Sequence, residues 1–251
     1  MGIGFASAGI KGSKHDLGSG GTAQATTANT TEVCVFCHTP HGSNTSASAP
    51  LWNKKLPTTS YTRYSSLGTS TLDGAETTVG SVSLACLSCH DGTQAMDVMI
   101  NAPGSGGYNA SGAEFDASAI GAMTGGPIPM LGSDLSNDHP VSIQYGGGGL
   151  NSSQADGAYT NSTFTDKDFN SVRKATINSN PVWWVDTNSD GTRDKDEMML
   201  YTRTVSSVTQ PYVECASCHD PHNAGTASAT SVAFLRKSNA NSAVCLACHN
   251  K

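Results

Sequence analysis

Hydrophobic and aromatic residues are scarce in this sequence. Only 37% of the 251 residues are hydrophobic and 6% are aromatic. A chain of this composition buries too little apolar surface to offset the conformational entropy that is lost when it is ordered. We therefore expect that an apolar group other than the side chains supplies part of the core, and that the fold contains little regular structure.

Long apolar runs and an excess of positive charge are also missing. No stretch reaches the ~20 apolar residues that a membrane-spanning helix needs, so we expect no membrane span. The 14 Lys and Arg residues are outnumbered by 20 Asp and Glu residues, which gives a formal net charge of −6. This balance disfavours nucleic acids and anionic membranes as partners, because binding to a phosphate backbone depends on positive charge.

What the sequence does contain is eight cysteines in four C-x-x-C-H motifs, with none left over. In this motif two thiols add to the vinyl groups of one porphyrin, and the histidine becomes the first axial ligand of the iron. Disulfides and zinc sites are the alternatives, but neither requires a histidine directly after the second cysteine. Chance would place four histidines there with a probability on the order of 10⁻⁶. The motifs predict four haem c groups, attached by Cys34 and Cys37, Cys86 and Cys89, Cys215 and Cys218, and Cys245 and Cys248, with His38, His90, His219 and His249 as proximal ligands.

Four further histidines match the number of irons. We therefore expect a distal histidine on every iron, six-coordinate haems throughout, and a protein that transfers electrons and is not an enzyme. A multihaem reductase of a small nitrogen oxyanion is the alternative, and it would need an open coordination position with acid-base groups around it. The predicted distal ligands are His15, His41, His139 and His222.

The short spacing of the C-x-x-C-H-x-P-H motifs restricts which iron a distal histidine reaches. His41 follows the proximal His38 by three residues on the same side of the ring, so it has to ligate a different haem, and the same holds for His222. We assign His41 to the haem on Cys86 and Cys89, and His222 to the haem on Cys245 and Cys248. His15 and His139 then serve the other two haems, in either order.

The motifs form an internal duplication. Each half has a lone histidine, a C-x-x-C-H-x-P-H motif, an apolar and basic segment, and a plain C-x-x-C-H motif. We expect a mostly irregular, haem-organised multihaem cytochrome c fold with short helical turns at the haem sites and little sheet. The expected parts are a first dihaem half at 9–100, a Gly-rich loop at 101–132 and a second dihaem half at 133–251.

The first residues of the chain suggest where in the cell the protein is located. Residues 1–8 read as the remnant of a signal peptide, with Ala6-Ser7-Ala8 as an A-x-A cleavage site, and the alternative is an ordinary N-terminal arm. Haem is attached to C-x-x-C-H on the outer side of the cytoplasmic membrane in bacteria and archaea. We expect an exported protein, extracellular or at the cell surface, with the periplasm as the alternative.

Several segments carry a family resemblance. They are the run at 14–17, the two C-x-x-C-H-x-P-H motifs, the segment at 49–53, the run at 139–141 and the C-terminal Cys-Leu-Ala-Cys-His-Asn-Lys. This haem-binding skeleton resembles the OmcE-like, filament-forming (nanowire) family of extracellular tetrahaem c-type cytochromes of metal-respiring bacteria; the loops between do not. The resemblance implies a head-to-tail homopolymer with one haem stack, which delivers respiratory electrons to external acceptors such as metal oxides.

The resemblance also implies that one axial histidine is donated across the subunit boundary. We favour His15 for this role, because it lies in a Gly- and Ser-rich leader that can reach a neighbour. His139 is the runner-up, since it too follows a long Gly-rich tract. The alternative is a monomeric periplasmic carrier with both histidines bound within one chain.

One motif at 186–197 stands apart from the haems. It matches the twelve-residue calcium loop, with oxygen ligands at positions 1, 3, 5 and 9, glycine at 6, a backbone carbonyl at 7 and a bidentate Glu at 12. The alternative is a polar turn. The flanks at 181–185 and 198–201 favour strands over helices, so we expect a structural calcium loop and not a signalling EF-hand pair. The predicted ligands of this Ca²⁺ cofactor are Asp186, Asn188, Asp190, Thr192, Asp194 and Glu197.

Overall fold

The computed structural model describes residues 9–104, 106–126, 129–224 and 233–250, so the predicted signal-peptide remnant at 1–8 lies outside the described residues. The chain divides into two compact units, each with two of the four C-x-x-C-H motifs. The first comprises Met1–Ser60, Leu84–Ser133 and Pro221–Gly225, and the second comprises Tyr61–Ser83, Asp134–Asp220 and Thr226–Lys251.

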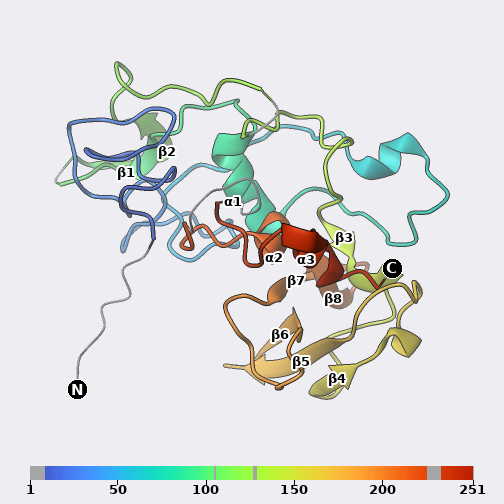
Figure 1. The fold of residues 1–251 in the computed structure, drawn as a ribbon. Coiled ribbons are helices and arrows are strands. Elements are labelled where there is room, and N and C mark those ends of the chain that lie inside the picture. The colour runs from blue at the N-terminus through green and yellow to red at the C-terminus, as the bar shows by residue number, and fades with distance from the viewer. Residues whose placement is uncertain (1–8, 105, 127–128, 225–232, 251) are drawn as a thin grey trace, which may run out of the picture. The chain divides into compact units, whose positions relative to one another are not determined.

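The second unit is built on a six-stranded antiparallel sheet of order β3-β8-β7-β6-β5-β4 (Figure 1). Two hairpins in it turn over two residues, Asn178-Ser179 and Ser206-Ser207, and all four residues have positive φ. This left-handed geometry matches the right-handed twist of the paired strands. The strands are β3 (Ile143–Gln144), β4 (Gly157–Tyr159), β5 (Val172–Ile177), β6 (Asn180–Val185), β7 (Met198–Val205) and β8 (Val208–Val213).

One face of this sheet carries the hydrophobic core of the second unit. Trp183 of β6 and Met198 of β7 are fully buried in it, together with Val172 of β5. Cys218 and Cys248, each the second cysteine of a haem motif, pack against the same cluster. The other buried members are Ile143, Tyr145, Leu150, Phe164, Val185, Leu200, Val213 and Ala247.

The expectation of a mostly irregular fold with little sheet is wrong. The structure contains a six-stranded and a two-stranded antiparallel sheet, and only three short α-helices are found among the described residues. The average composition did not predict the larger sheet, because β-branched and aromatic residues are concentrated in the segments that form β5, β6, β7 and β8. The prediction that strands flank the 186–197 motif is confirmed by β6 and β7.

The first unit has a smaller core. Strands β1 (Val98–Asn101) and β2 (Tyr108–Glu114) pair antiparallel with a register shift, so the tract predicted as loop at 101–132 contains a strand. The buried cluster of this unit joins Phe36, Met96 and Met99 with Leu17 and Ile120. Cys37 and Cys89 pack against it, so both units pack cysteines of two haem motifs on one hydrophobic cluster.

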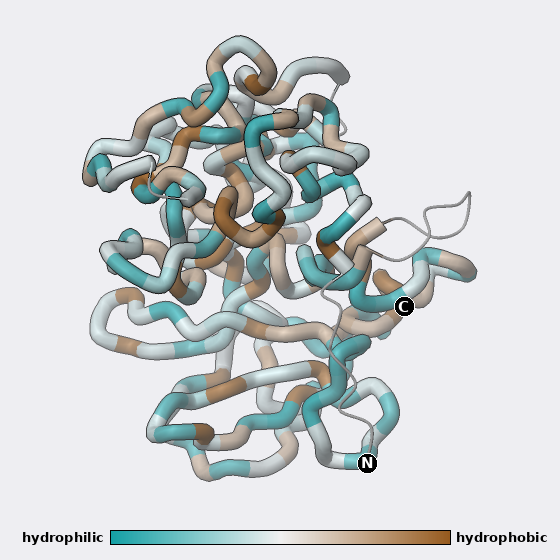
Figure 2. Tube along the Cα trace, turned by 90° about the vertical axis from the view of Figure 1, so that its left-hand side faces the viewer, coloured by the Kyte–Doolittle hydropathy of each residue, from teal (hydrophilic) through white to brown (hydrophobic). Residues whose placement is uncertain are grey.

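Helices are short throughout the described part of the chain. None is long and apolar enough to cross a membrane, and Figure 2 shows hydrophobic residues as short segments separated by hydrophilic ones. The α-helices are α1 (Ser81–His90), α2 (Cys215–Cys218) and α3 (Ala243–Leu246), and 3₁₀ turns cover Tyr64–Leu67, Tyr145–Gly147, Asn161–Thr163 and Ala240–Ser242.

The two C-x-x-C-H-x-P-H segments share one backbone arrangement. In the first unit His38 forms an antiparallel bridge with Trp52, and the amide of Asn53 donates to the carbonyl of Cys37 at 2.8 Å. In the second unit His219 forms the same bridge with Leu235, and the amide of Arg236 donates to the carbonyl of Cys218 at 2.8 Å. Asn53 and Arg236 therefore occupy equivalent positions of the duplication.

Candidate haem-binding site

Each C-x-x-C-H motif forms about one helical turn. The backbone amide of the proximal histidine donates to the carbonyl of the first cysteine for His38 (2.8 Å), His219 (3.2 Å) and His249 (2.9 Å). His90 ends α1, which contains both cysteines of its motif. A helical turn places residues three and four apart on one face, so two thiols and an imidazole point to the same side. This is the arrangement that one porphyrin requires.

Hydrogen bonds to backbone carbonyls orient three of the imidazoles. The Nδ1 atom of His38 lies 2.7 Å from the carbonyl oxygen of Pro50, and that of His90 lies 2.8 Å from the carbonyl oxygen of Pro129. Nδ1 of His139 lies 3.0 Å from the carbonyl oxygen of Pro140. An Nδ1–H that donates to a carbonyl leaves the lone pair on Nε2, the atom that binds a metal. No sequence signal identifies these carbonyl partners in advance, because Pro50 and Pro129 lie 12 and 39 positions after the histidines that they orient.

The histidine rings form pairs with the spacing of two ligands on one iron. The ring centroids are 6.1 Å apart for His15 and His90, 6.1 Å for His38 and His222, and 6.3 Å for His139 and His249. Two imidazoles on opposite faces of one iron, with metal–nitrogen bonds of about 2 Å, have centroids about 6 Å apart. Both rings of each pair belong to one unit. The residues therefore fit haem iron with two axial histidines.

These pairs differ from the distal ligands expected from sequence. His15 lies beside the proximal ligand of the second motif, and not beside that of the first or third. His222 lies beside the proximal ligand of the first motif, where the fourth was expected, and His139 lies beside that of the fourth, where the first or third was expected.

With these pairs, His41 is the distal histidine that remains to be assigned to an iron. Because His15 is the partner of His90, the assignment of His41 to the haem on Cys86 and Cys89 is not supported. His41 lies in the first unit, and His219, the proximal ligand of the third motif, lies in the second.

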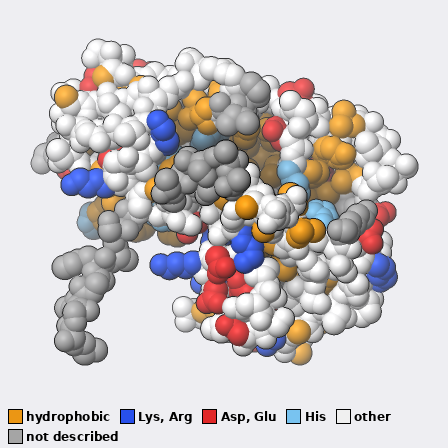
Figure 3. Space-filling model, in the orientation of Figure 1, with side chains coloured by type: hydrophobic (Ala, Val, Ile, Leu, Met, Phe, Trp, Pro, Cys, Tyr) orange, Lys and Arg blue, Asp and Glu red, His pale blue; other side chains and the backbone are white. Residues whose placement is uncertain are grey.

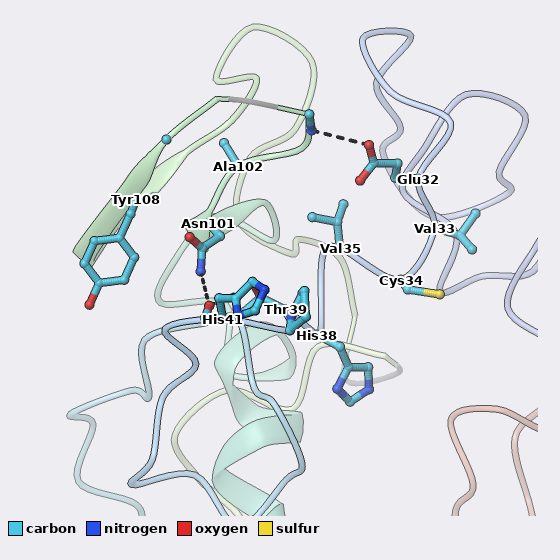
Figure 4. A pocket seen from close by; sticks show the side chains of 13 residues that line it. Glu32, Val33, Cys34, Val35, His38, Thr39, His41, Asn101, Ala102 and Tyr108 are labelled. Carbon is cyan, nitrogen blue, oxygen red and sulfur yellow. Dashed lines mark hydrogen bonds between the residues drawn. The ribbon is translucent and has the colours of Figure 1, made fainter.

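His41 borders a hollow of the first unit. The hollow has a volume of about 720 Å³, and Cys34, His38 and His41 line it together with the segment around Asn101 and Tyr108 (Figure 4). The side-chain amide of Asn101 donates to the carbonyl of His41 at 2.7 Å, which fixes the backbone that carries this exposed imidazole. Histidine side chains also reach the surface among hydrophobic ones in Figure 3. An attachment thiol and two imidazoles thus open onto one space.

Two of the attachment thiols are poorly suited to act as nucleophiles. All eight cysteines lie in the described residues, and none is in a disulfide. Although Cys37 as a residue is only partly buried, burial of its thiol against the cluster raises its pKa to about 12, and burial does the same for Cys248. Thiols with so high a pKa are poor nucleophiles at neutral pH. Among the described residues, no three His, Cys, Asp or Glu side chains are gathered into a preformed metal site, and this includes the carboxylates of the 186–197 motif.

The carboxylates of the 186–197 motif bind backbone amides. Asp186 Oδ2 accepts from the amide of Gly191 at 3.0 Å, and the amide of Asp190 donates to Asn188 Oδ1 at 3.0 Å. Glu197, which is 1% exposed, accepts from the amides of Thr187 and Asp194 at 2.8 and 3.0 Å. Gly191 has φ of +82°, a conformation that favours glycine. The chain thus turns as a calcium loop does, between two strands.

Two other observations concern the inner face of this loop. The second carboxylate oxygen of Asp186, Oδ1, is buried and has no hydrogen-bond partner, and its side chain is 6% exposed. Burial, with the nearby charges of Asp186 and Asp194, raises the pKa of Glu197 against the opposing effect of its two amide bonds. Several acidic groups therefore gather here, and Arg173 offsets part of their charge through an ion pair of 3.6 Å between its Nε and Asp186 Oδ2.

Comparison with known proteins supports the haem chemistry for the C-terminal part. A family model described as the doubled CXXCH motif matches residues 209–251, which include the third and fourth motifs. No curated protein matches the chain. Paired motifs of this type bind haem c covalently and indicate a multihaem c-type cytochrome. The chemistry of the chain is therefore covalent haem c binding, and the role that this chemistry indicates is electron transfer.

Proposed function

We propose that the protein carries four haem c groups, each with two axial histidines, and that it conducts electrons and is not an enzyme. The observation that supports this most directly is the set of three imidazole pairs with centroids 6.1 to 6.3 Å apart. An iron held between two imidazoles has no open position for a substrate, whereas a reductase needs one. When bound, each haem supplies a one-electron Fe(III)/Fe(II) couple. The chain holds its ring by two thiols and keeps the imidazole Nε2 atoms available.

Spectroscopy of the purified holoprotein tests this proposal. We expect four haems per chain, a low-spin absorption spectrum in both oxidation states, and no carbon monoxide binding to the reduced native protein. Potentials should lie below the standard hydrogen potential, because bis-histidine ligation lacks the methionine sulfur that raises them. High-spin features in the native protein would favour the reductase instead, and fewer than four haems would contradict the stoichiometry.

The three imidazole pairs account for His15, His139 and His222, which leaves His41 as the candidate distal ligand of the haem on Cys215 and Cys218. We assign His219 as its proximal ligand and His41 as its distal ligand. The exposed ring of His41 lies on backbone held by two hydrogen bonds, from Thr39 Oγ1 at 3.0 Å and from the amide of Asn101 at 2.7 Å. A distal ligand that is exposed and held in place suits an iron outside its own unit.

We further propose that the chain polymerises head to tail into an extracellular filament, with His41 of one subunit on the iron bound by His219 of the next. A contact of this kind between different surfaces extends indefinitely when it does not close into a ring. His15 and His139, favoured from sequence, are poor candidates because each already lies beside a proximal histidine of its own unit. External acceptors such as metal oxides remain the proposed destination of the electrons, and a monomeric periplasmic carrier with His41 bound in the same chain is the alternative.

We also propose that the 186–197 loop binds Ca²⁺ in a structural role. The supporting observations are the buried and unpartnered Oδ1 of Asp186 and the buried Glu197 at position 12. Without an ion, backbone amides bind these carboxylates, and the ion would draw in the oxygens that remain. The site joins β6 to β7, so it would stabilise the sheet of the second unit.

A further inference from the structure

Lys54 is a buried cation without an acidic partner. Its side chain lies in the first unit with 1% of the residue exposed, and its Nζ donates to the carbonyl oxygens of Met96 at 2.7 Å and Val98 at 3.0 Å. It forms no ion pair with a carboxylate among the described residues. Asp97, between the two carbonyl groups in sequence, instead accepts from the amides of Phe115 and Asp116. Burying an ammonium group is costly, so its retention here calls for a reason.

The position of Lys54 relates it to two haem-attachment motifs. The carbonyl oxygen of Met96 that accepts from Lys54 also lies 3.9 Å from Sγ of Cys89. The preceding residue, Asn53, donates its amide to the carbonyl of Cys37 at 2.8 Å. Cys37 and Cys89 pack against the same hydrophobic cluster. The ammonium group therefore lies close to the attachment sites of both haems of the first unit.

The second half of the duplication keeps a cation at the equivalent segment. Arg236, equivalent to Asn53, donates from Nε to the carbonyl of Ala216 at 3.1 Å and from Nη1 to the carbonyl of Lys195 at 3.2 Å, with no carboxylate partner among the described residues. The next residue, Lys237, is instead paired with Asp196 at 3.0 Å. The carbonyl-bound cation therefore lies one position earlier in the second half than in the first. Each unit nevertheless has one cationic side chain that donates only to carbonyl groups.

We propose that Lys54 and its counterpart Arg236 raise the reduction potentials of the haems attached beside them. Reduction removes one positive charge from the iron, so a fixed positive charge nearby stabilises the reduced form. At an effective dielectric constant of about 20, a unit charge about 10 Å from a redox centre changes such an equilibrium by roughly tenfold. A carboxylate partner would cancel most of this effect, which gives a reason for its absence. This inference rests on the proposed electron-transfer function.

The test is a spectroscopic redox titration of holoprotein variants. Lys54→Met removes the charge and keeps an unbranched side chain that fills the buried space. We expect the reduction equilibrium of at least one haem to become about tenfold less favourable, a shift of about 59 mV to lower potential for a one-electron couple. Lys55→Met is the matched control, because this adjacent residue is exposed and its charge is screened by solvent. It should leave the potentials unchanged.

Further variants separate charge from packing. Lys54→Arg keeps the charge. Its potentials should differ from those of the wild type by only a small fraction of the shift that Lys54→Met causes. Arg236→Met should lower the potentials of the other haem pair, while Lys237→Met, which removes a charge already paired with Asp196, should not. Four haems and unchanged low-spin spectra in Lys54→Met, together with unchanged potentials, would overturn the inference and leave the electron-transfer function intact. If the wild-type protein lacked low-spin haems, that result would instead contradict the proposed function.

Discussion

At the level of single residues, the angle between paired imidazole planes differs from one haem site to the next. His38 and His222 are nearly parallel, with an interplanar angle of 17°, whereas the angle is 73° for His15 and His90 and 62° for His139 and His249. When the two imidazole planes are parallel, the d orbitals of low-spin Fe(III) that interact with them differ in energy. When the planes are perpendicular, these orbitals have almost the same energy. The protein is therefore expected to hold magnetically distinct haems.

Electron paramagnetic resonance of the oxidised protein checks this expectation. We predict a rhombic low-spin signal from the first haem, and strongly anisotropic signals with a large maximum g value from the second and fourth. His222→Ala should remove the rhombic signal and create one high-spin haem, and His15→Ala should remove an anisotropic one. If His222→Ala spares the rhombic signal, the pairing of His222 with His38 is wrong.

The sequence indicates candidate ligands, but it does not indicate which histidines lie beside each other. Spacing alone indicates that Cys34, Cys37 and His38 act together, because one helical turn brings them to one face. The partner of His222 lies 184 positions earlier in the chain, so only the tertiary path of the backbone selects it. The assumption that neighbouring motifs share ligands failed for this reason.

At the level of secondary-structure elements, local pattern was informative where average composition was not. The run at 181–185 predicted a strand, and β6 forms there with Trp183 fully buried. The low average content of apolar residues gave no sign that a hydrophobic cluster would form on one sheet. Haem c was expected to supply part of the core, and the second unit also has a hydrophobic cluster of its own.

The β6–β7 loop provides a prediction about calcium. Glu197→Gln keeps the shape of the side chain and removes a bidentate ligand, so it should abolish a Ca²⁺-dependent rise in thermal stability and expose the loop to proteolysis, with haem content unchanged. Asp196→Asn is the matched control, because Asp196 is largely exposed and pairs with Lys237. Calorimetric titration of the chelated protein with Ca²⁺ measures the binding directly. Equal stability of the wild type with Ca²⁺ and with chelator would reduce the loop to a polar turn.

The turn that precedes the third haem motif depends on a buried ion pair. Glu214 accepts from Arg203 Nη1 at 3.1 Å and from the hydroxyls of Ser83 and Ser142 at 2.5 and 3.0 Å. Arg203→Met leaves this carboxylate buried without its cation, and we expect a loss of about 3 kcal/mol in unfolding free energy near neutral pH. Adding Glu214→Gln to Arg203→Met should recover most of that loss. Guanidinium unfolding followed by far-ultraviolet circular dichroism gives both values.

The same pair has a pH dependence of defined sign. Burial raises the pKa of Glu214 above its ordinary value of 4.5, against the opposing effects of Ser83 and Arg203. A carboxyl group with a raised pKa in the folded state favours folding most when protonated, and this contribution is lost as the pH rises through the raised pKa. The destabilisation caused by Arg203→Met should therefore shrink as the pH falls towards 4.5. A destabilisation that stays constant or grows on acidification would indicate that Arg203 acts by packing.

At the level of the whole molecule, each unit keeps two haem motifs against one hydrophobic cluster. Cys37 and Cys89 share the cluster of the first unit, and Cys218 and Cys248 share that of the second. Cys89 contributes to the raised pKa of Cys37, and Cys218 contributes to that of Cys248, so the two thiols of each pair are neighbours. Under the proposed function, haems attached to such neighbouring thiols would be close enough to exchange electrons, and each unit would act as a conducting pair. Conduction beyond one unit then depends on how the pairs are joined.

The proposed junction gives the last prediction, which concerns His41. If His41 of one subunit ligates the iron bound by His219 of the next, then His41→Ala should abolish filaments and leave one high-spin, carbon monoxide-binding haem in every subunit. His15→Ala should also create one high-spin haem, because it unpairs His90, but filaments should persist. Electron microscopy and absorption spectra of the same preparations separate the two outcomes. A wild type that is only ever monomeric, with all four haems low-spin, would place His41 on an iron of its own chain and favour the soluble carrier.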